Sequence, residues 1–551
     1  MDQGGRLGIV VRGSLSSGLE ARLDGPGSVE DMRVGKFVKI RGEKHDFFCL
    51  ITDVLLGAAN DKVLADPPPE SEPFLRQVLA GTATYGLVQV QPMLMLARDG
   101  QRGAGEIEGP QPVKTIPTHF STVFVADDAD FERVFGAPGE DRFELGTPID
   151  MDAPIRLNLR RFVERSNGVF GKSGTGKSFL TRLLLCGVIK SRVAANLIFD
   201  MHSEYGWETQ TEDRHFVKGL KQLFPESVTV YTLDADSARK RGVQPDGEIT
   251  IGYDEIEVDD VALLHEELRL NPTAVESANI VVERHGSGWL SALLQMDGDA
   301  VRAFAAANGA NLESLSALRR KLSAHLKPLR FLRDRGEAGA NGSGRRALDE
   351  VIARLRRGDH VVLEFGQHRR LLPYMLVANI ITRRVHGLWI QQMERFLQSK
   401  DESDRPTPLM ITIEEAHRFL NPDAARQTSF GTIAREMRKF NVTLLVVDQR
   451  PSGIDDEVLS QLGTRITAQL NDDQDIDAIF TGVSGSSKLR QTLASLDSRE
   501  QAMILGHAVP MPVVFQARKY DQAFYAAISP FAGARELVSA RAYEELFPDE
   551  G

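Results

Sequence analysis

The sequence lacks several features that would place a protein in a class at once. It has only two cysteines, Cys49 and Cys186, among 551 residues. Two separate cysteines exclude a disulfide framework or a cysteine-based zinc site, and they indicate a reducing compartment. No segment approaches the roughly 20 consecutive apolar residues that a membrane helix requires. The N-terminal stretch MDQGGRLGIVVRG is too polar for a signal peptide, so we expect a cytoplasmic protein without a membrane anchor.

The sequence also lacks an overall positive charge. Its formal net charge is -11 at pH 7, so no global basic field indicates nucleic-acid binding. A polyanion would have to meet a local basic surface, such as a channel. Helix-turn-helix and zinc-finger patterns are absent as well, and sequence-specific reading of DNA bases is therefore not expected.

The distribution of strand-like and helix-like patterns divides the chain into domains. Residues 1–115 contain short strands rich in Val, Ile and Phe between glycine turns, which is typical of a small barrel or sandwich. Over residues 116–520, apolar strands alternate with helical stretches, which predicts an α/β core with a parallel sheet. Residues 255–335 interrupt this core with helical periodicity and are predicted to be a helical insert. Residues 521–551 are expected to form a C-terminal helical tail.

Residues 171–178, GKSGTGKS, match the phosphate-loop pattern G-x-x-x-x-G-K-[ST]. The strand NGVF precedes the loop and an apolar helical stretch follows it, which is the context that this motif requires. Lys177 is expected to reach the β- and γ-phosphates of ATP, and the Ser178 hydroxyl to bind Mg²⁺. The residues expected to contact ATP are Gly171, Lys172, Ser173, Gly174, Thr175, Gly176, Lys177, Ser178 and Phe179.

A phosphate loop needs an acidic strand end that holds the metal and orients water, and LMITIEEAH supplies one. Glu414 is predicted to lie in the second shell of the metal. Glu415 is predicted to be the general base that polarises the attacking water. Two acids are also common at a solvated helix N-terminus, but the upstream loop favours the catalytic interpretation.

Two more strands end in polar residues. These residues are Asp200, His202 and Glu204 in LIFDMHSEY, and Asp448, Gln449 and Arg450 in LLVVDQRPS. Gln449 is a candidate γ-phosphate sensor that would link hydrolysis to movement. No Cys or His cluster surrounds His202, so we interpret it as a loop residue near the nucleotide and not as a metal ligand.

In this order, the motifs resemble those of the HerA family of hexameric DNA translocases, which are close to the FtsK motor. The most discriminating stretch is REMRKFNVTLLVVDQRPSGIDDEVLSQLGTRI. The resemblance implies a RecA-like core, an N-terminal β-barrel, and a ring of six subunits with ATP between neighbours and double-stranded DNA in the central channel. Members of this family work with a nuclease, typically NurA, in DNA end resection. Others pair with sirtuin-like or nuclease effectors in anti-phage defence.

The resemblance also implies roles for single residues. Lys177 matches the phosphate-loop lysine, Glu415 the catalytic glutamate, and Gln449 the glutamine of Q-R-P-S. An arginine should reach the γ-phosphate of the neighbouring subunit, and the candidates are Arg165, Arg435 and Arg438. The departures are Glu414 where the wider class often has Asp, DMHSEY for D-P-H-G-E-Y, and Asp448 for a small hydroxyl residue.

Three functions fit these motifs. The first is a DNA-translocating ATPase that works with a nuclease or another effector in DNA repair or anti-phage defence. The second is a ring that mainly assembles and regulates a defence effector. The third is a secretion or conjugation motor, which usually has a membrane attachment.

A basic cluster at the end of the insert bears on this choice, because it is either a solvated helix face or a surface that meets phosphate backbones. Its members are Arg319, Arg320, Lys321, Lys327, Arg330, Arg333 and Arg335.

Overall fold

The structure is a computed structural model, and its chain divides into two units. The first unit contains residues 1–162, 168–180 and 463–519, and the second unit contains residues 163–167, 181–462 and 520–551. The described residues are 5–24, 28–59, 65, 67–98, 109–149, 151, 153–210, 214–334, 347–368, 370–426, 428–483, 487–496 and 500–529. Outside them lie residues 101–108, Arg335 of the basic cluster, residues 336–346, and most of the predicted C-terminal tail, residues 530–551.

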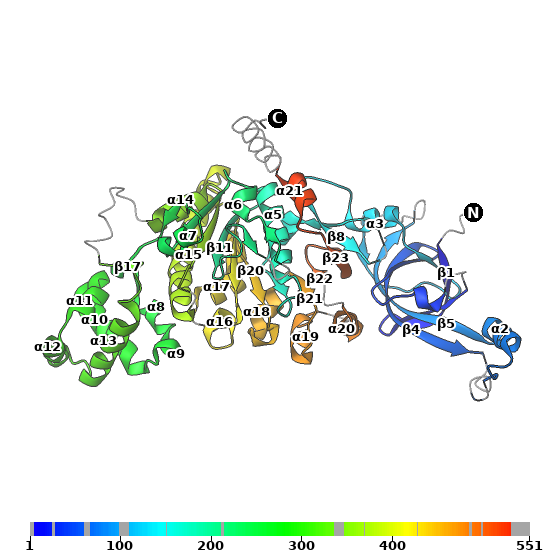
Figure 1. Ribbon diagram of the computed structural model, residues 1–551, viewed down its shortest axis with the longest axis horizontal. Helices are drawn as coiled ribbons and strands as arrows, with labels where there is room; N and C mark the ends of the chain where they lie inside the picture. Colours follow the sequence, from blue (N-terminus) through cyan, green and yellow to red (C-terminus); the bar gives the residue numbers. More distant parts are fainter. Residues whose placement is uncertain are drawn as a thin grey trace, which may run out of the picture. The chain divides into compact units, whose positions relative to one another are not determined.

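The first unit begins with an antiparallel barrel, drawn mainly in blue in Figure 1. Its strands are β1 (Arg6–Ser14), β2 (Gly18–Leu23), β3 (Phe37–Arg41), β4 (His45–Ala58), β5 (Thr84–Ala97), β6 (Gln111–Pro112) and β7 (Thr122–Val125). The order is β2-β1-β7-β3-β4-β5-β6, and an additional pairing of β2 with β5 closes the barrel. Successive side chains alternate between the two faces of a strand, so that Val88 and Val90 of β5 point into the core with 0% exposure.

The N-terminal strands form a closed barrel and not a sandwich. Two elements of this region were not predicted by the sequence pattern. Strand β7 follows the expected boundary at residue 115, yet it pairs with both β1 and β3. Helix α2 (Pro73–Thr82) follows the proline-rich loop between β4 and β5 and begins with Pro73. Proline is well accommodated in the first helical turn, where its missing N–H costs no hydrogen bond.

The rest of the first unit leads to the phosphate loop. Its elements are η1 (Val29–Asp31), α3 (Asp128–Phe135), β8 (Arg142–Pro148), β9 (Ile155–Asn158), α4 (Leu159–Val163), β10 (Asn167–Phe170), β21 (Thr464–Ala468), α19 (Asp473–Ile479), α20 (Ser487–Ala494), β22 (Gln501–Gly506) and β23 (Val513–Ala517). The strand order is β10-β21-β22-β23-β8-β9. β10 ends at Phe170, as predicted, and α5 (Lys177–Ser191) begins after the loop.

The second unit contains the parallel sheet that the sequence predicts. Its strands are β11 (Ala195–Asp200), β14 (Val228–Thr232), β15 (Gly247–Glu248), β18 (His360–Glu364), β19 (Leu409–Glu414) and β20 (Val442–Asp448). The order is β15-β14-β18-β11-β19-β20, and neighbouring strands pair in parallel. All of these strands except the short β15 are buried along their whole length, which explains their continuous apolar character.

Helices and short strands surround this sheet. They are β12 (Thr209–Gln210), β13 (Phe216–Val217), α6 (Leu220–Leu223), α7 (Ala235–Lys240), α14 (Ala347–Arg356), α15 (Leu371–Ser399), η4 (Glu402–Asp404), α16 (His417–Leu420), η5 (Ala424–Arg426), α17 (Ser429–Glu436), η6 (Met437–Phe440), η7 (Pro451–Gly453), α18 (Asp456–Gln461) and α21 (Gln522–Ile528). Within the described residues, no helix is both long and apolar enough to cross a membrane.

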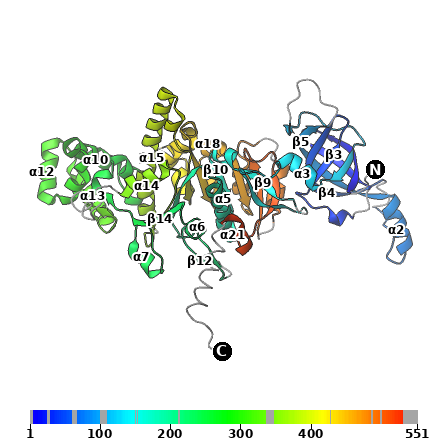
Figure 2. The same ribbon diagram turned by 90° about the horizontal axis from the view of Figure 1, so that it is seen from above.

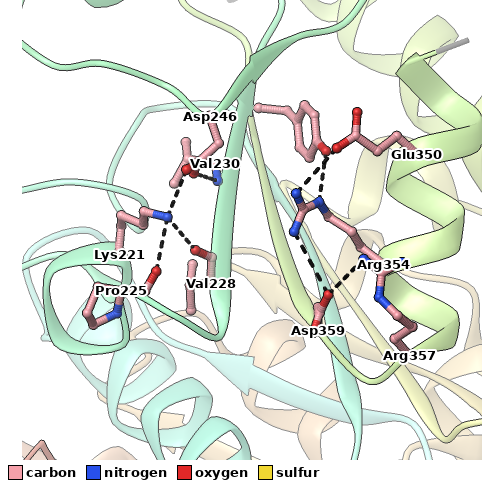
Figure 3. A network of polar contacts seen from close by, with 10 residues as sticks. Lys221, Pro225, Val228, Val230, Asp246, Glu350, Arg354, Arg357 and Asp359 are labelled. Atoms are coloured by element: carbon pink, nitrogen blue, oxygen red, sulfur yellow. Dashed lines mark hydrogen bonds and ion pairs between the residues drawn. The ribbon is translucent and has the colours of Figure 1, made fainter. Parts of the chain in front are cut away.

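Polar side chains hold the segments around strand β14 in place (Figure 3). Lys221 Nζ donates to the carbonyls of Pro225 and Val228 at 3.2 and 2.9 Å and to Asp246 Oδ1 at 2.9 Å. Arg354 of α14 donates to the Tyr231 hydroxyl at 3.1 Å. These bonds attach the turn before β14, the segment leading to β15 and helix α14 to the same strand.

Helices lie where the sequence predicts a helical insert, between the short parallel strands β16 (Ile251–Gly252) and β17 (Leu332–Arg333). Its elements are η2 (Tyr253–Glu255), α8 (Val258–Ala262), α9 (His265–Leu268), α10 (Pro272–His285), η3 (Gly286–Gly288), α11 (Trp289–Gln295), α12 (Gly298–Asn308) and α13 (Leu312–Leu326). Helices α10, α12 and α13 lie together in both views (Figures 1 and 2). The buried residues of α13 recur every three or four positions, as an amphipathic helix requires.

Two members of the basic cluster have partners inside the insert. Lys321 Nζ donates to the Arg269 carbonyl, and Lys327 Nζ donates to the Leu294 carbonyl at 3.2 Å. Arg330 lies 3.6 Å from Asp236, but its side chain remains 87% exposed. The two lysines therefore bond to the insert itself, whereas Arg330 presents its charge to solvent.

Charged residues fix the insert to the long helix α15. Asp260 of α8 is fully buried and accepts hydrogen bonds from Asn379 Nδ2 at 2.7 Å and from Arg383 at 2.8 and 3.2 Å. Arg384 bonds to Glu255 at 2.8 Å. A buried carboxylate is tolerated only with such donors, so α8 and α15 are tied to each other.

We expect Asp260→Ala to destabilise the protein by about 2 kcal/mol, because it removes the hydrogen bonds that the buried carboxylate accepts from Asn379 and Arg383, while Arg383 keeps its ion pair with Glu257. Thermal or urea unfolding monitored by circular dichroism measures the loss. The neighbouring Asp259 is exposed, and Asp259→Ala serves as the matched control with unchanged stability. Equal stability of the two variants would show that the ion pair does not hold the insert.

Candidate active site

The phosphate loop in the first unit has the backbone that phosphate binding requires. Gly174 and Gly176 have φ values of 79° and 86°, a left-handed region that glycine adopts without strain. A Cβ atom on Gly176 would meet no atom within 4 Å, so the loop surface is open there. Thr175 Oγ1 donates to the Lys172 carbonyl at 2.7 Å and stabilises the turn. Since α5 begins at Lys177, the loop amides stand at a helix N-terminus, where anions are favoured.

In the second unit, four parallel strands end in carboxylates. These residues are Asp200 of β11, Glu364 of β18, Glu414 of β19 and Asp448 of β20. Three of them are completely buried, and Glu414 is 7% exposed. The carboxyl ends of parallel strands meet at one edge of a sheet, which is where α/β proteins bind ligands.

Asp200 and Glu364 are neighbours in the β11–β18 register, and local donors hold both. Asp200 accepts the backbone N–H groups of Glu204, Tyr205 and Gly206 at 2.8, 2.9 and 3.2 Å. Burial raises the pKa of Asp200, and these hydrogen bonds oppose that shift. Glu364 bonds to Arg241 at 2.5 Å, while burial raises its pKa. Asp200 and Glu364 therefore serve to shape the loop and the sheet edge.

Two tyrosines fix the position of Glu414. The Tyr205 hydroxyl donates to Glu414 Oε1 at 2.9 Å, and the Tyr374 hydroxyl donates to the Glu414 carbonyl at 3.2 Å. Burial raises the pKa of both tyrosines well above the usual value, so both hydroxyls remain protonated donors. The carboxylate of Glu414 thus has a fixed direction.

The protein oxygens at this site could bind Mg²⁺ only together with the phosphates of a bound nucleotide, as is usual for phosphate-loop proteins. Among the described residues, no group of three or more His, Cys, Asp and Glu side chains could hold a metal. Mg²⁺ commonly keeps several waters and relies on one or two protein oxygens together with the phosphates of the nucleotide. Ser178 and Glu414 supply oxygens of the right kind and stay the predicted metal-binding residues.

Glu415 differs from Glu414 in both backbone and exposure. Its φ is 49°, a left-handed conformation that costs a residue other than glycine about 1–2 kcal/mol. Such strain often occurs at functional sites. Its side chain is 30% exposed, and Gln449 Nε2 donates to its Oε1 at 3.3 Å. The structure therefore brings Glu415 and Gln449 together. Because Glu415 is partly exposed, a water molecule can reach its carboxylate.

The three candidate interface arginines have different surroundings in the second unit. Arg435 donates to the Ala425 carbonyl at 2.9 Å and is half-buried. Arg165 has a buried Nε without a hydrogen-bond partner among the described residues. Arg438 is exposed, so it is the candidate whose side chain is most accessible to a neighbouring subunit. His202 is also exposed, at the loop after β11.

Sequence reasoning missed one contact at this edge. Asp448 appeared as a polar residue at a strand end and as a departure from the family pattern, but no partner was predicted for it, and His417 was not singled out. In the structure, His417 Nδ1 lies 3.0 and 3.1 Å from the two carboxylate oxygens of Asp448. This contact could have been predicted only from the positions of the two residues in the chain. His417 comes two residues after Glu415, and Asp448 ends the neighbouring strand.

Comparison with known families finds two matching segments. Residues 7–98 match the HAS barrel domain, and residues 143–385 match the central domain of helicase HerA. The chain is 30% identical over 204 residues to the DNA double-strand break repair helicase HerA of Sulfolobus acidocaldarius, a match that covers 34% of this chain and 41% of that protein. It is 25% identical over 401 residues to the protein of the same name from Saccharolobus solfataricus, covering 72% of each.

Solved structures show a weaker likeness. The bacterial conjugative coupling protein TrwB is similar with a TM-score of 0.47 and 10% identity, over 72% of this chain and 92% of that chain. This overlap is too small to add to the family assignment.

The parallel sheet, the phosphate loop and the two glutamates at the end of β19 define the class of the protein, which is a P-loop ATPase with a RecA-like core. Within this class, the chain is similar to the HerA helicases, because residues 143–385 match the model of their central domain.

The loop after β11 offers a test of local strain. Ser203 has a φ of 58°, and its Oγ is buried without a hydrogen-bond partner among the described residues. The related family pattern has glycine at this position. We expect Ser203→Gly to stabilise the protein by about 1 kcal/mol, since relief of about 1–2 kcal/mol of strain outweighs the added chain entropy.

The melting temperature measures this effect. Ser227 lies in the turn before β14 with an ordinary negative φ, so Ser227→Gly should lower the melting temperature and serves as the control. If both glycine variants melt earlier than the wild type, the conformation assigned to Ser203 is wrong.

Proposed function

We propose that this chain is an ATP-driven translocase or helicase of double-stranded DNA and that six copies form a ring around the DNA. The observation that carries this proposal is Glu415, accessible at a strained turn and bonded to Gln449, in a chain that also has a phosphate loop. Relatives named DNA double-strand break repair helicases support DNA as the substrate.

The chemistry follows from the residues. Residues 171–179 bind the phosphates of ATP, and Lys177 offsets the charge that develops on them. Glu415 accepts a proton from the attacking water, while Gln449 senses the γ-phosphate and reports its loss through its bond to Glu415. Mg²⁺, held by the Ser178 hydroxyl and through water by Glu414, would supply additional charge neutralisation.

The ring is part of the proposal because the site needs a cation from a neighbour. Among the three candidates, Arg438 is favoured by its exposure, and Arg435 is disfavoured by its bond to the Ala425 carbonyl. Such an arginine stabilises the charge of the transition state, and this contribution is typically worth about 10³–10⁵ in rate.

A partner is also part of the proposal, and the barrel within residues 1–115 is its docking platform. Four apolar side chains on β4 and α2 are exposed: Leu56 at 84%, Phe74 at 79%, Leu75 at 42% and Val78 at 41%. Exposed apolar groups of this kind mark protein interaction sites. The partner is a NurA-like nuclease or another effector, in DNA end processing or anti-phage defence.

We expect double-stranded DNA of any sequence to stimulate ATP turnover, because the motor has to grip phosphate backbones. DNA binding should weaken steeply between 50 and 200 mM salt, by about 10³ or more if six or more phosphates are contacted. Phosphate-release assays with and without DNA test this, with Lys177→Ala and Glu415→Gln as inactive controls. ATP turnover that is indifferent to DNA would instead support a ring that regulates an effector.

We expect Arg438→Ala to bind ATP and assemble normally but to lose turnover by about 10³-fold or more. Mixing it with Glu415→Gln subunits should restore part of the activity, since some interfaces then combine an intact glutamate with an intact neighbouring arginine. Arg165→Ala and Arg435→Ala serve as parallel variants. Full activity of Arg438→Ala would transfer the role to one of these two, and full activity of all three would rule out a trans arginine among them.

A further inference from the structure

Asp448 binds His417 through two separate groups. The backbone N–H of His417 donates to Asp448 Oδ2 at 2.6 Å, and the ring Nδ1 lies 3.0 Å from the same oxygen. The carboxylate also accepts the backbone N–H of Arg450 at 2.8 Å and is completely buried. Carboxylate oxygens accept hydrogen bonds, so we assign Nδ1–H of His417 as the donor in this contact.

These bonds continue the pairing of β19 and β20 beyond the strand ends. The last backbone pair is Glu414 with Val447. After it, Asp448 binds His417 and Gln449 binds Glu415. The turn that carries Glu415 is therefore attached to the end of β20 by two neighbouring side-chain contacts.

A glycine packs against the histidine from the loop after β20. A Cβ atom on Gly453 would lie 3.2 Å from His417 Cβ and 3.8 Å from Cγ, so this position leaves little room for a larger residue. The same loop is bonded to the end of α16, where the Asp455 N–H donates to the Leu420 carbonyl at 2.7 Å. His417 is thus confined between Asp448 and Gly453.

The geometry points to His417 as a positioning residue for Glu415, an inference that rests on the proposed ATPase function. Through Nδ1–H and its backbone N–H, His417 fixes the start of α16 on Asp448. This contact holds the left-handed turn at Glu415, two residues earlier, against its conformational cost. The Nδ1 atom lies 3.9 Å from Glu415 Oε2, which is too long for a hydrogen bond, so His417 acts through the backbone and not by direct proton exchange.

Two substitutions separate the positioning role of His417 from other roles of its imidazole ring. His417→Asn keeps an amide N–H near the position of Nδ1, whereas His417→Leu removes the donor at similar size. We expect the leucine variant to lose kcat by about 100-fold, the effect of a misplacement of about 1 Å. KM for ATP should change by less than about two-fold, because the phosphate loop is untouched. The asparagine variant should recover most of kcat.

Steady-state ATP turnover and ATP binding of the full-length protein measure both constants. Arg418→Gln is the control, since Arg418 is the exposed neighbour on the same helix, and it should retain wild-type kcat. If His417→Leu fails to fold, Gly453→Ala provides the second variant. Its added methyl group crowds the His417 side chain without removing Nδ1–H, so it should also lower kcat more than it changes KM.

The outcomes distinguish the two proposals. An inactive wild type contradicts the proposed ATPase function itself, whereas an active wild type with a fully active leucine variant overturns only the role of His417. An asparagine variant as inactive as the leucine variant overturns it too, since Nε2 would then be the important atom. A crystal structure of His417→Leu gives a readout without turnover: Glu415 should leave its left-handed conformation, and an unchanged turn would contradict the inference.

Discussion

Four carboxylates buried at one edge of a parallel sheet must each find a hydrogen-bond donor, and this requirement organises the second unit. Arg241 serves Glu364, the backbone of the following loop serves Asp200, Tyr205 serves Glu414, and His417 serves Asp448. The donors come from the connections after the strands or from elements packed beside them. The hydrogen bonds that satisfy the four buried charges therefore also shape the edge of the site, and the side chain of Glu415, next to Glu414, is partly exposed to solvent.

The two adjacent glutamates show how this constraint separates two roles. Glu414 is the last residue of β19 and is held by tyrosines, so its direction is fixed. Glu415 departs from strand geometry into a left-handed turn, and its side chain is 30% exposed. A general base has to meet water, whereas a residue that orients a metal benefits from rigidity. The backbone thus supports the assignment that the order of the two residues suggested.

Much of this arrangement could be predicted from the sequence, because the signals are local. Continuous apolar strands, the loop before Lys177 and the acids after Ile413 each lie within a few residues of their context. The donors could not be predicted, since Arg241 lies 123 residues from Glu364 and Tyr374 lies 40 residues from Glu414. Helix α2 was missed because a short helix that begins with proline follows a stretch with the composition of a loop. The left-handed turn at Glu415 was missed because residues other than glycine rarely adopt it.

Helix α15 joins two features that are distant in the sequence. Tyr374, in its first turn, bonds to the backbone of Glu414, and Arg383, nine residues later, bonds to the buried Asp260 of the insert. Nine residues of α-helix span about 14 Å at about 1.5 Å per residue. The helix therefore connects the carboxyl edge of the sheet to the insert directly, and the two contacts are separated by a single continuous helix.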